Sequence, residues 1–163
     1  MNFLSRLFSP RPRGPNFSKH LRLQHWPSAI YAIGDVHGCL GALIKLEAMI
    51  EADGTQFSGP KLIVMLGDYV DRGPQSAGVI AHLNAAPPAG FARVALAGNH
   101  EEMMLGAVEG MNDRSWLEFG GAETLASYGI DVAKYSSASP RARQDLLLSH
   151  VPAEHLSFLR GLA

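Results

Sequence analysis

The chain has 163 residues, of which 47% are hydrophobic, and this composition fits one globular domain with its own core. The net charge of -1 indicates no class of partner, and a single cysteine, Cys39, excludes an internal disulfide framework. No apolar run approaches the roughly 18 residues that span a bilayer, and residues 1–8 are too short and interrupted for a signal peptide, so we expect a cytoplasmic protein.

Residues 1–28 are rich in proline and basic side chains. We expect them to form a flexible arm ahead of a domain at 29–163, because dense proline disfavours both helix and sheet. A basic arm could contact nucleic acid or an anionic membrane. No interleaved aromatic residues of the RNA-binding kind support this reading, so we assign no nucleic-acid or membrane partner.

Apolar strands alternate with helical patterns over residues 30–97. The pattern predicts strands at 30–34, 62–66 and 94–97, with helices at 39–52 and 75–83 between them. The first helix has a predicted apolar stripe of Leu40, Leu43, Leu46 and Ile50, widened by Ile44 and Met49. This order predicts an α/β fold with a parallel βαβαβ core, in which the three loops after the strands meet at one edge.

The remaining residues predict a mainly helical segment. Helices are expected at 101–111, 122–128 and 153–159, and Ser139-Pro140 has the pattern of a helix start. Residues 134–138 are expected to form a serine-rich loop. The last helix is expected to expose apolar side chains, namely Leu156, Phe158, Leu159 and Leu162.

Each of the three strands is followed by a side chain that could bind a metal ion. Asp35 and His37 lie two residues apart, so in an extended loop both project to the same side and can reach one ion. Asp68 could bridge two ions, and Asn99 offers a neutral oxygen. This mixed nitrogen and oxygen set suits Mn, Fe or Zn. Two such ions could generate hydroxide and bind both oxygens of an in-line displacement at phosphorus.

Three further residues of these loops supply groups for phosphoester chemistry. Arg72 carries a planar guanidinium that matches a phosphate, and His100 could protonate a leaving alkoxide. Asp71 could hydrogen-bond this imidazole and fix its orientation. Taken singly, each loop could be an ordinary turn, and Asp71 with Arg72 could form a surface ion pair. Their joint occurrence after three successive strands favours a catalytic site.

The segments GDVHG (34–38), GDYVDRG (67–73) and GNHE (98–101) together resemble the three signatures of the phosphoprotein phosphatase family of calcineurin-like metallophosphoesterases. Residues 116–129 also resemble the bacterial serine/threonine phosphatase branch. The resemblance implies a β-sandwich flanked by helices, of which this chain would form the N-terminal part. It also implies hydrolysis by direct attack of a metal-bound hydroxide on phosphorus, without a phosphoenzyme.

The resemblance further implies a role for each motif residue. The metal ligands would be Asp35 and His37 for the first ion, Asp68 for both ions and Asn99 for the second. The phosphate contacts would be Arg72, Asn99 and His100, and the catalytic set would be His100, Asp71 and Arg72.

One departure from the family pattern concerns the second metal. The family has two more histidine ligands and a second phosphate-binding arginine downstream, and this sequence shows none of them. His150 precedes Pro152 and a predicted helix, so we interpret it as a loop or helix-end residue. We therefore expect an incomplete second site, a truncated family domain, and a C-terminal face that a partner chain could cover.

Four functions stay open at this level. The first is a phosphatase acting on phosphoserine or phosphothreonine, and the second is a symmetrical dinucleoside polyphosphate hydrolase. The latter proteins commonly lack the second aspartate of the middle motif and end the third in Asn-His-Asp, so Asp71 and Glu101 favour the first. The third is a non-enzymatic metal-binding or regulatory module, and the fourth is an inactive fragment.

Overall fold

The computed structural model describes residues 23, 25–111 and 115–163. Its sheet has three parallel strands in the order β1 (Ala29–Ile33), β2 (Lys61–Met65) and β3 (Phe91–Ala95). The register pairs Ile33 with Met65 and Met65 with Ala95, so the three strands end side by side. The predicted parallel βαβαβ core is confirmed, with each strand boundary shifted by one to three residues.

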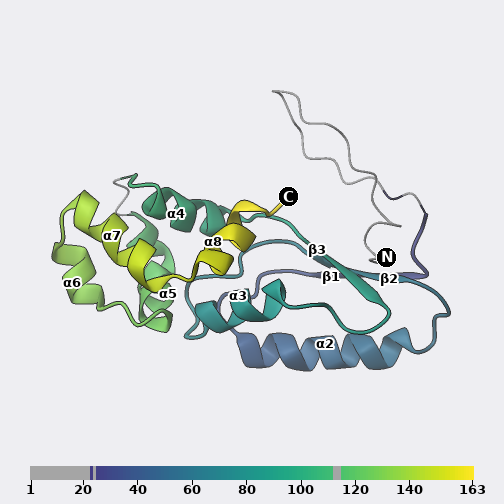
Figure 1. Ribbon diagram of the computed structural model, residues 1–163. Helices are drawn as coiled ribbons and strands as arrows, with labels where there is room; N and C mark the ends of the chain where they lie inside the picture. Colours follow the sequence, from purple (N-terminus) through teal and green to yellow (C-terminus); the bar gives the residue numbers. More distant parts are fainter. Residues whose placement is uncertain (1–22, 24, 112–114) are drawn as a thin grey trace, which may run out of the picture.

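Two helices connect the strands and cover the same face of the sheet. They are α2 (Leu40–Gly54) and α3 (Ser76–Asn84), and both lie below the strands in Figure 1. The opposite face carries a smaller apolar cluster of Leu62, Ala92 and Val94, against which Leu23 packs. This layering leaves the edge at the carboxyl ends of the strands free for the loops.

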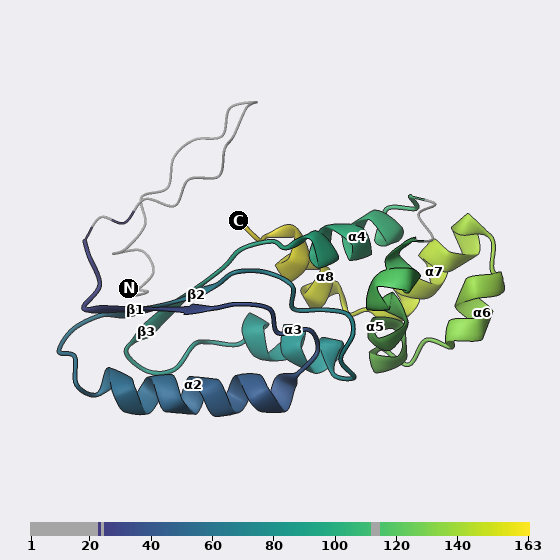
Figure 2. The same ribbon diagram turned by 180° about the vertical axis from the view of Figure 1, so that it is seen from behind.

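The described residues after β3 form a helical lobe at one end of the molecule, as both ribbon views show (Figures 1 and 2). The lobe consists of α4 (Asn99–Val108), the π-helical turn η1 (Leu117–Gly121), α5 (Ala122–Ser127), α6 (Val132–Ser137), α7 (Pro140–His150) and α8 (Ala153–Arg160). Within the described residues, no helix is long and apolar enough to cross a membrane. The lobe packs on the sheet layer through α3, which contacts both α5 and α8.

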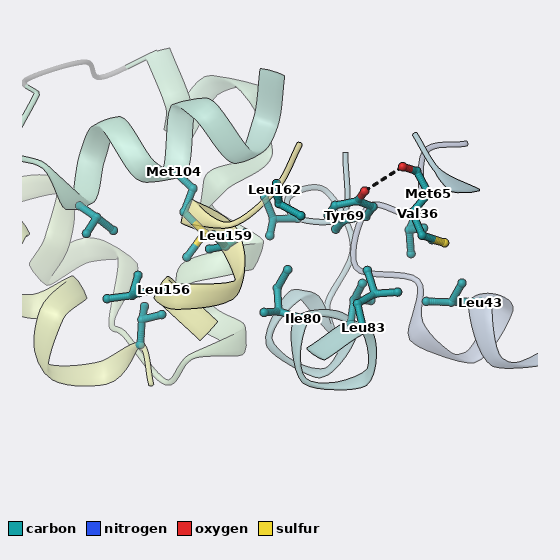
Figure 3. Packing of buried hydrophobic residues seen from close by; sticks show 14 of the residues in the cluster. Val36, Leu43, Met65, Tyr69, Ile80, Leu83, Met104, Leu156, Leu159 and Leu162 are labelled. Carbon is teal, nitrogen blue, oxygen red and sulfur yellow. Dashed lines mark hydrogen bonds between the residues drawn. The ribbon is translucent and has the colours of Figure 1, made fainter. Parts of the chain in front are cut away.

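The last helix is buried, which corrects the expectation that it exposes an apolar face. Leu156, Leu159 and Leu162 are only 5%, 2% and 3% exposed, and Phe158 is half-buried. Figure 3 shows these leucines in the same cluster as Ile80 and Met104. The main-chain amide of Ala163 also donates to Ala95, and Ala97 donates to Ala163. The helix therefore gives no reason to expect a covering partner chain.

The predicted stripe of α2 is also partly wrong. Leu43 and Ile50 are buried as expected, but Ile44, Leu46 and Met49 are exposed. The inward position between the two buried residues belongs to Glu47, whose carboxylate accepts from Arg93 at 2.9 Å and lies 2.5 Å from His82. A charged residue can occupy that position because β3 and α3 supply its partners.

Residues 134–138 are not a loop, because most of them lie in α6. Asp131 caps this helix by accepting from the amide of Lys134 at 2.8 Å, and this start signal was overlooked in the sequence. The predicted cap by Ser139 is confirmed, and His150 ends α7 as expected. The other helices differ from their predicted bounds by at most three residues, and α5 and α8 begin at the predicted residue.

The predicted arm at 1–28 lies mostly outside the described residues. Within its described part, Leu23 packs on the sheet, and the amide of Ser28 donates to Pro60 at 2.7 Å. The domain contacts therefore begin before residue 29.

Candidate active site

Glycines bring the three loops into direct backbone contact. A Cβ on Gly73 would collide with the carbonyl of His37, and one on Gly67 would lie 2.6 Å from the amide nitrogen of Gly98. The amides of Val36 and His37 both donate to the carbonyl of Asp68, at 3.0 and 2.9 Å. The glycines of the motifs therefore allow a separation that no other residue type permits.

Four non-glycine residues of the loops have left-handed backbones: His37, Asp68, Asp71 and Arg72, with φ between 42° and 73°. This conformation is costly for residues with a Cβ and persists only where the surroundings enforce it. Such residues cluster at functional sites. All four are residues that the sequence selects as metal-binding or catalytic.

His37 is oriented as a metal ligand should be. Its Nδ1 lies 2.8 Å from the carbonyl oxygen of Val70, and because a carbonyl can only accept, Nδ1 carries the proton. The lone pair is then on Nε2, which is buried and has no hydrogen-bond partner among the described residues. Fixing the outer nitrogen in this way is characteristic of metal-binding histidines.

The surrounding donors fit a divalent cation. Ligand atoms of His37, Asp68 and His100 all lie within 4.8 Å of one another. A carboxylate oxygen of Asp35 lies 3.8 Å from His37 Nε2, on a side chain that is 67% exposed. Imidazole and carboxylate together suit Mn, Fe or Zn. The buried, unpartnered nitrogen beside two carboxylates is the observation that supports this fit.

The fourth predicted ligand, Asn99, follows β3 directly after Gly98. Asn99 is the exposed first residue of α4, next to His100. The group of His37 and Asp68, with Asp35 beside His37, also includes the imidazole of His100, to which the sequence analysis gave a proton-transfer role.

His100 and Asp71 form a buried pair. His100 Nδ1 lies 2.8 Å from a carboxylate oxygen of Asp71, and the two side chains are 2% and 0% exposed. The predicted hydrogen bond is therefore present, and the alternative of a surface ion pair for Asp71 is excluded. Trp116 Nε1 and Thr124 Oγ1 also donate to this carboxylate, at 2.9 and 2.7 Å.

The environment of Asp71 acts on its acidity in two directions. Burial raises the pKa of this carboxyl group, and the hydrogen bonds from His100, Thr124 and Trp116 act to lower it. These three partners hold the carboxylate in one orientation. The imidazole of His100 is held with it.

Arg72 completes this constellation. One of its guanidinium nitrogens lies 3.2 Å from His100 Nε2, and since a guanidinium can only donate, Nε2 accepts. With Nδ1 donating to Asp71, the imidazole is neutral in this arrangement. The Arg72 side chain is exposed, so it can turn from the imidazole to an incoming anion.

Glu101 organises the loop, a role that the sequence analysis missed. Its buried carboxylate accepts from four amides, namely those of Asp68 (2.8 Å), Tyr69 (2.7 Å), Val70 (3.2 Å) and Gly98 (2.9 Å). Burial raises the pKa of Glu101, and these hydrogen bonds act to lower it. A signal existed, because an acidic residue three positions after a helix cap predicts a bond back to the cap amide.

The turn η1 closes over Arg72. The carbonyl of Gly120 accepts from the Arg72 amide at 3.0 Å, and a Cβ at Gly120 would lie 2.8 Å from the nitrogen of that amide. A pocket of about 350 Å³ opens beside the arginine, lined by Arg72, Glu118, Phe119, Gly120 and Glu123. Only the similarity of residues 116–129 to the bacterial branch pointed to this segment in the sequence.

Comparison with known proteins relates this chain to one family and to relatives with differing named activities. A family model described as calcineurin-like phosphoesterase matches residues 28–160. Serine/threonine-protein phosphatase 1 of Salmonella typhimurium is 36% identical over 92 residues, which is 56% of this chain and 38% of the relative. The symmetrical bis(5'-nucleosyl)-tetraphosphatase of Paracidovorax citrulli is 41% identical over 83 residues, which is 50% of this chain and 27% of the relative.

A solved structure, the cold-active protein-tyrosine phosphatase of a psychrophilic Shewanella species, is 22% identical. The match covers 96% of this chain and 47% of that one, with a TM-score of 0.48. The chain thus matches less than half the length of each of these relatives.

Proposed function

The chain belongs to the calcineurin-like phosphoesterase family, and from this premise we propose that it is a metal-dependent phosphatase acting on phosphoserine or phosphothreonine in polypeptides. The supporting observation is the buried His100–Asp71 pair, with the Arg72 guanidinium 3.2 Å from the free nitrogen of the imidazole. This arrangement places the guanidinium of Arg72, which can bind an anion, next to the imidazole of His100, which can transfer a proton.

The metal ligands belong to the proposal. Asp35, His37 and Asp68 would hold one divalent ion, and Asp68 with Asn99 would hold a second, less completely surrounded ion. Bound divalent ions would activate water as the nucleophile and stabilise negative charge on the phosphoryl oxygens. Mn, Fe and Zn all match the donor set.

The chain's own residues would bind the phosphoryl group and move a proton. Arg72 would bind two phosphoryl oxygens with its planar fork, helped by Asn99 and His100. As Arg72 turns to the phosphate, His100 Nε2 loses its present partner and can take up, through solvent, the proton that the attacking water releases. The imidazole would then protonate the leaving serine or threonine oxygen, while Asp71 keeps the ring oriented and stabilises its charged form.

Hydrolysis of dinucleoside tetraphosphates is the second candidate function. The 41% identity to the symmetrical tetraphosphatase of Paracidovorax citrulli favours it. Asp71 and Glu101 argue against it. As described above, the sequence pattern of those hydrolases commonly lacks the aspartate and has an aspartate in place of the glutamate. Both residues make buried hydrogen bonds here, so neither is an incidental surface difference.

The test is hydrolysis by the purified chain with Mn²⁺, comparing a phosphoserine peptide with a dinucleoside tetraphosphate. We expect the peptide to be the better substrate. His100→Asn and Asp71→Asn should each lower kcat by about 100-fold or more, the usual size of a lost general acid. His150→Asn, on an exposed histidine at the end of α7, is the matched control and should leave kcat unchanged.

Two outcomes would reject the proposal. Turnover by His100→Asn within about threefold of the wild type would exclude the assigned proton transfer. Tight Mn²⁺ binding without hydrolysis of either substrate would favour the third possibility, a non-enzymatic metal-binding module.

A further inference from the structure

The pocket beside Arg72 has a composition unlike that of a plain phosphate site. Arg72 is its one basic lining residue, and the others are two glutamates, an aromatic ring and a glycine. Glu118, Phe119 and Glu123 are all exposed to solvent, with Phe119 at 53%. An anion can bind at Arg72, but the adjoining surface carries negative charge.

The two carboxylates are not neutralised within the described residues. No described lysine or arginine lies within 4.0 Å of the Glu118 or Glu123 carboxylate, and neither carboxylate pairs with Arg72. The Arg72 guanidinium contacts His100 instead. Among the described residues, the charges of Arg72 and of the two glutamates are therefore not compensated by one another.

The position of these residues relative to Arg72 is defined by the backbone. Gly120 adopts φ of 105°, kinks the chain between Phe119 and α5, and accepts from the Arg72 amide. Glu118 and Phe119 lie in η1 on one side of this turn, and Glu123 lies in α5 on the other. A substrate phosphate on Arg72 would therefore have these three side chains beside it, in the same pocket.

Carboxylates around an exposed aromatic face attract ammonium and guanidinium groups through charge and cation–π contacts. The same carboxylates repel a ligand with several negative charges. We propose that this pocket selects phosphopeptides with lysine or arginine next to the phosphorylated residue and disfavours dinucleoside tetraphosphates. This inference rests on the proposed phosphatase function and narrows its substrate class.

The experiment uses three phosphoserine peptides of equal length, with arginine, glutamate or alanine flanking the phosphoserine. The measured quantity is the ratio of kcat/KM for the arginine-flanked over the glutamate-flanked peptide, with Mn²⁺ at low salt. One exposed ion pair changes affinity by about 1.4- to 5-fold, so two independent carboxylates should give a ratio of about 2- to 25-fold. Because the ratio is internal to each variant, a general change in activity cancels.

The double variant Glu118→Gln/Glu123→Gln removes both charges at nearly constant shape. Its ratio should fall below about twofold, and its kcat/KM for the dinucleoside tetraphosphate should rise. Raising NaCl to about 0.5 M should reduce the wild-type ratio in the same way, because salt screens exposed charges. Glu51→Gln, on an exposed glutamate of α2, is the control and should keep the wild-type ratio.

The outcomes separate this inference from the function it rests on. A wild-type ratio near one, or a ratio that survives in the double variant, would overturn the inference. Continued hydrolysis of the alanine-flanked peptide in that case would leave the phosphatase proposal standing. Failure of the wild type to hydrolyse any of the peptides would reject both.

Discussion

Replacing Glu101 by glutamine tests how the active-site loop is held. One carboxylate oxygen accepts from the amides of Asp68 and Gly98, and the other accepts from Tyr69 and Val70. Glutamine has one oxygen and one NH₂ group, so either orientation leaves two buried amides facing a donor. Each unsatisfied buried donor costs about 1–3 kcal/mol. Removing the buried charge offsets part of this cost, so we expect Glu101→Gln to lose about 2–4 kcal/mol.

Urea unfolding followed by circular dichroism measures this loss. With a slope of about 2 kcal/mol per molar urea, the midpoint should fall by about 1–2 M. Mn²⁺ binding, measured by isothermal titration calorimetry, should weaken as well, because the loop that carries Asp68 loses its anchor. Glu102→Gln is the matched control, since Glu102 is exposed on the same helix. Its unfolding free energy should stay within about 0.5 kcal/mol of the wild type.

A midpoint for Glu101→Gln within about 0.25 M of the wild type, with unchanged Mn²⁺ affinity, would refute this reasoning. It would mean that the four amides find other partners or water, and that the carboxylate does not position the loop.

Three other perturbations are expected to change the stability of the protein in different directions. Gly120→Ala should lower stability by about 2–4 kcal/mol and reduce phosphoester turnover, because its φ is 105° and the new Cβ would meet Arg72 at 2.8 Å; thermal unfolding and a phosphatase assay check this. Gly41→Ala should raise the thermal midpoint by about 2 °C, because Gly41 is helical and its Cβ would meet nothing within 4 Å. Burial lowers the pKa of His155 below its ordinary value of 6.5, so the unfolded chain takes up the proton first as the pH falls. Stability should therefore be complete above about pH 7 and decline below it until the pH passes the folded-state pKa, a decline that urea titrations should show to be smaller in His155→Gln.

Each of these expectations has a result that contradicts it. A Gly120→Ala protein with wild-type stability and turnover would show that η1 is not pressed against Arg72. A lower midpoint for Gly41→Ala would indicate a neighbour that the structure does not show. If the unfolding free energy of His155→Gln depended on pH as in the wild type, a group other than His155 would cause the acid sensitivity. His150→Gln, on an exposed histidine, is the control for that comparison.

The features that could be predicted from the sequence are those that depend on residues close together in the chain. Alternating apolar runs and helical stretches predicted the parallel sheet. The placement of Asp35, Asp68 and Asn99 after successive strands predicted that their loops meet at one edge. The buried bond between His100 and Asp71 was also expected, because the two motifs that contain them follow neighbouring strands.

What escaped prediction depends on contacts between segments far apart in sequence. Glu47 occupies an inward position of α2 only because Arg93 and His82 reach it, so the helix presents exposed apolar residues that a periodicity argument places inside. The leucines of α8 look exposed when only the chain order is considered, and they are buried because the helix folds back onto α3 and α4. Trp116 and Thr124 are 45 and 53 residues from their partner Asp71, and no local signal connects them.

The left-handed backbones of His37, Asp68, Asp71 and Arg72 have a consequence for attempts to engineer this protein. Each position sacrifices about 1–3 kcal/mol of conformational energy that glycine would recover. At Arg72, whose side chain is exposed, libraries screened only for heat resistance would accordingly enrich glycine and discard the guanidinium. At the buried Asp71, glycine would also leave its hydrogen-bond donors unsatisfied, so the same screen would not favour it. A thermostable descendant should be sought by varying other positions and keeping these four constant.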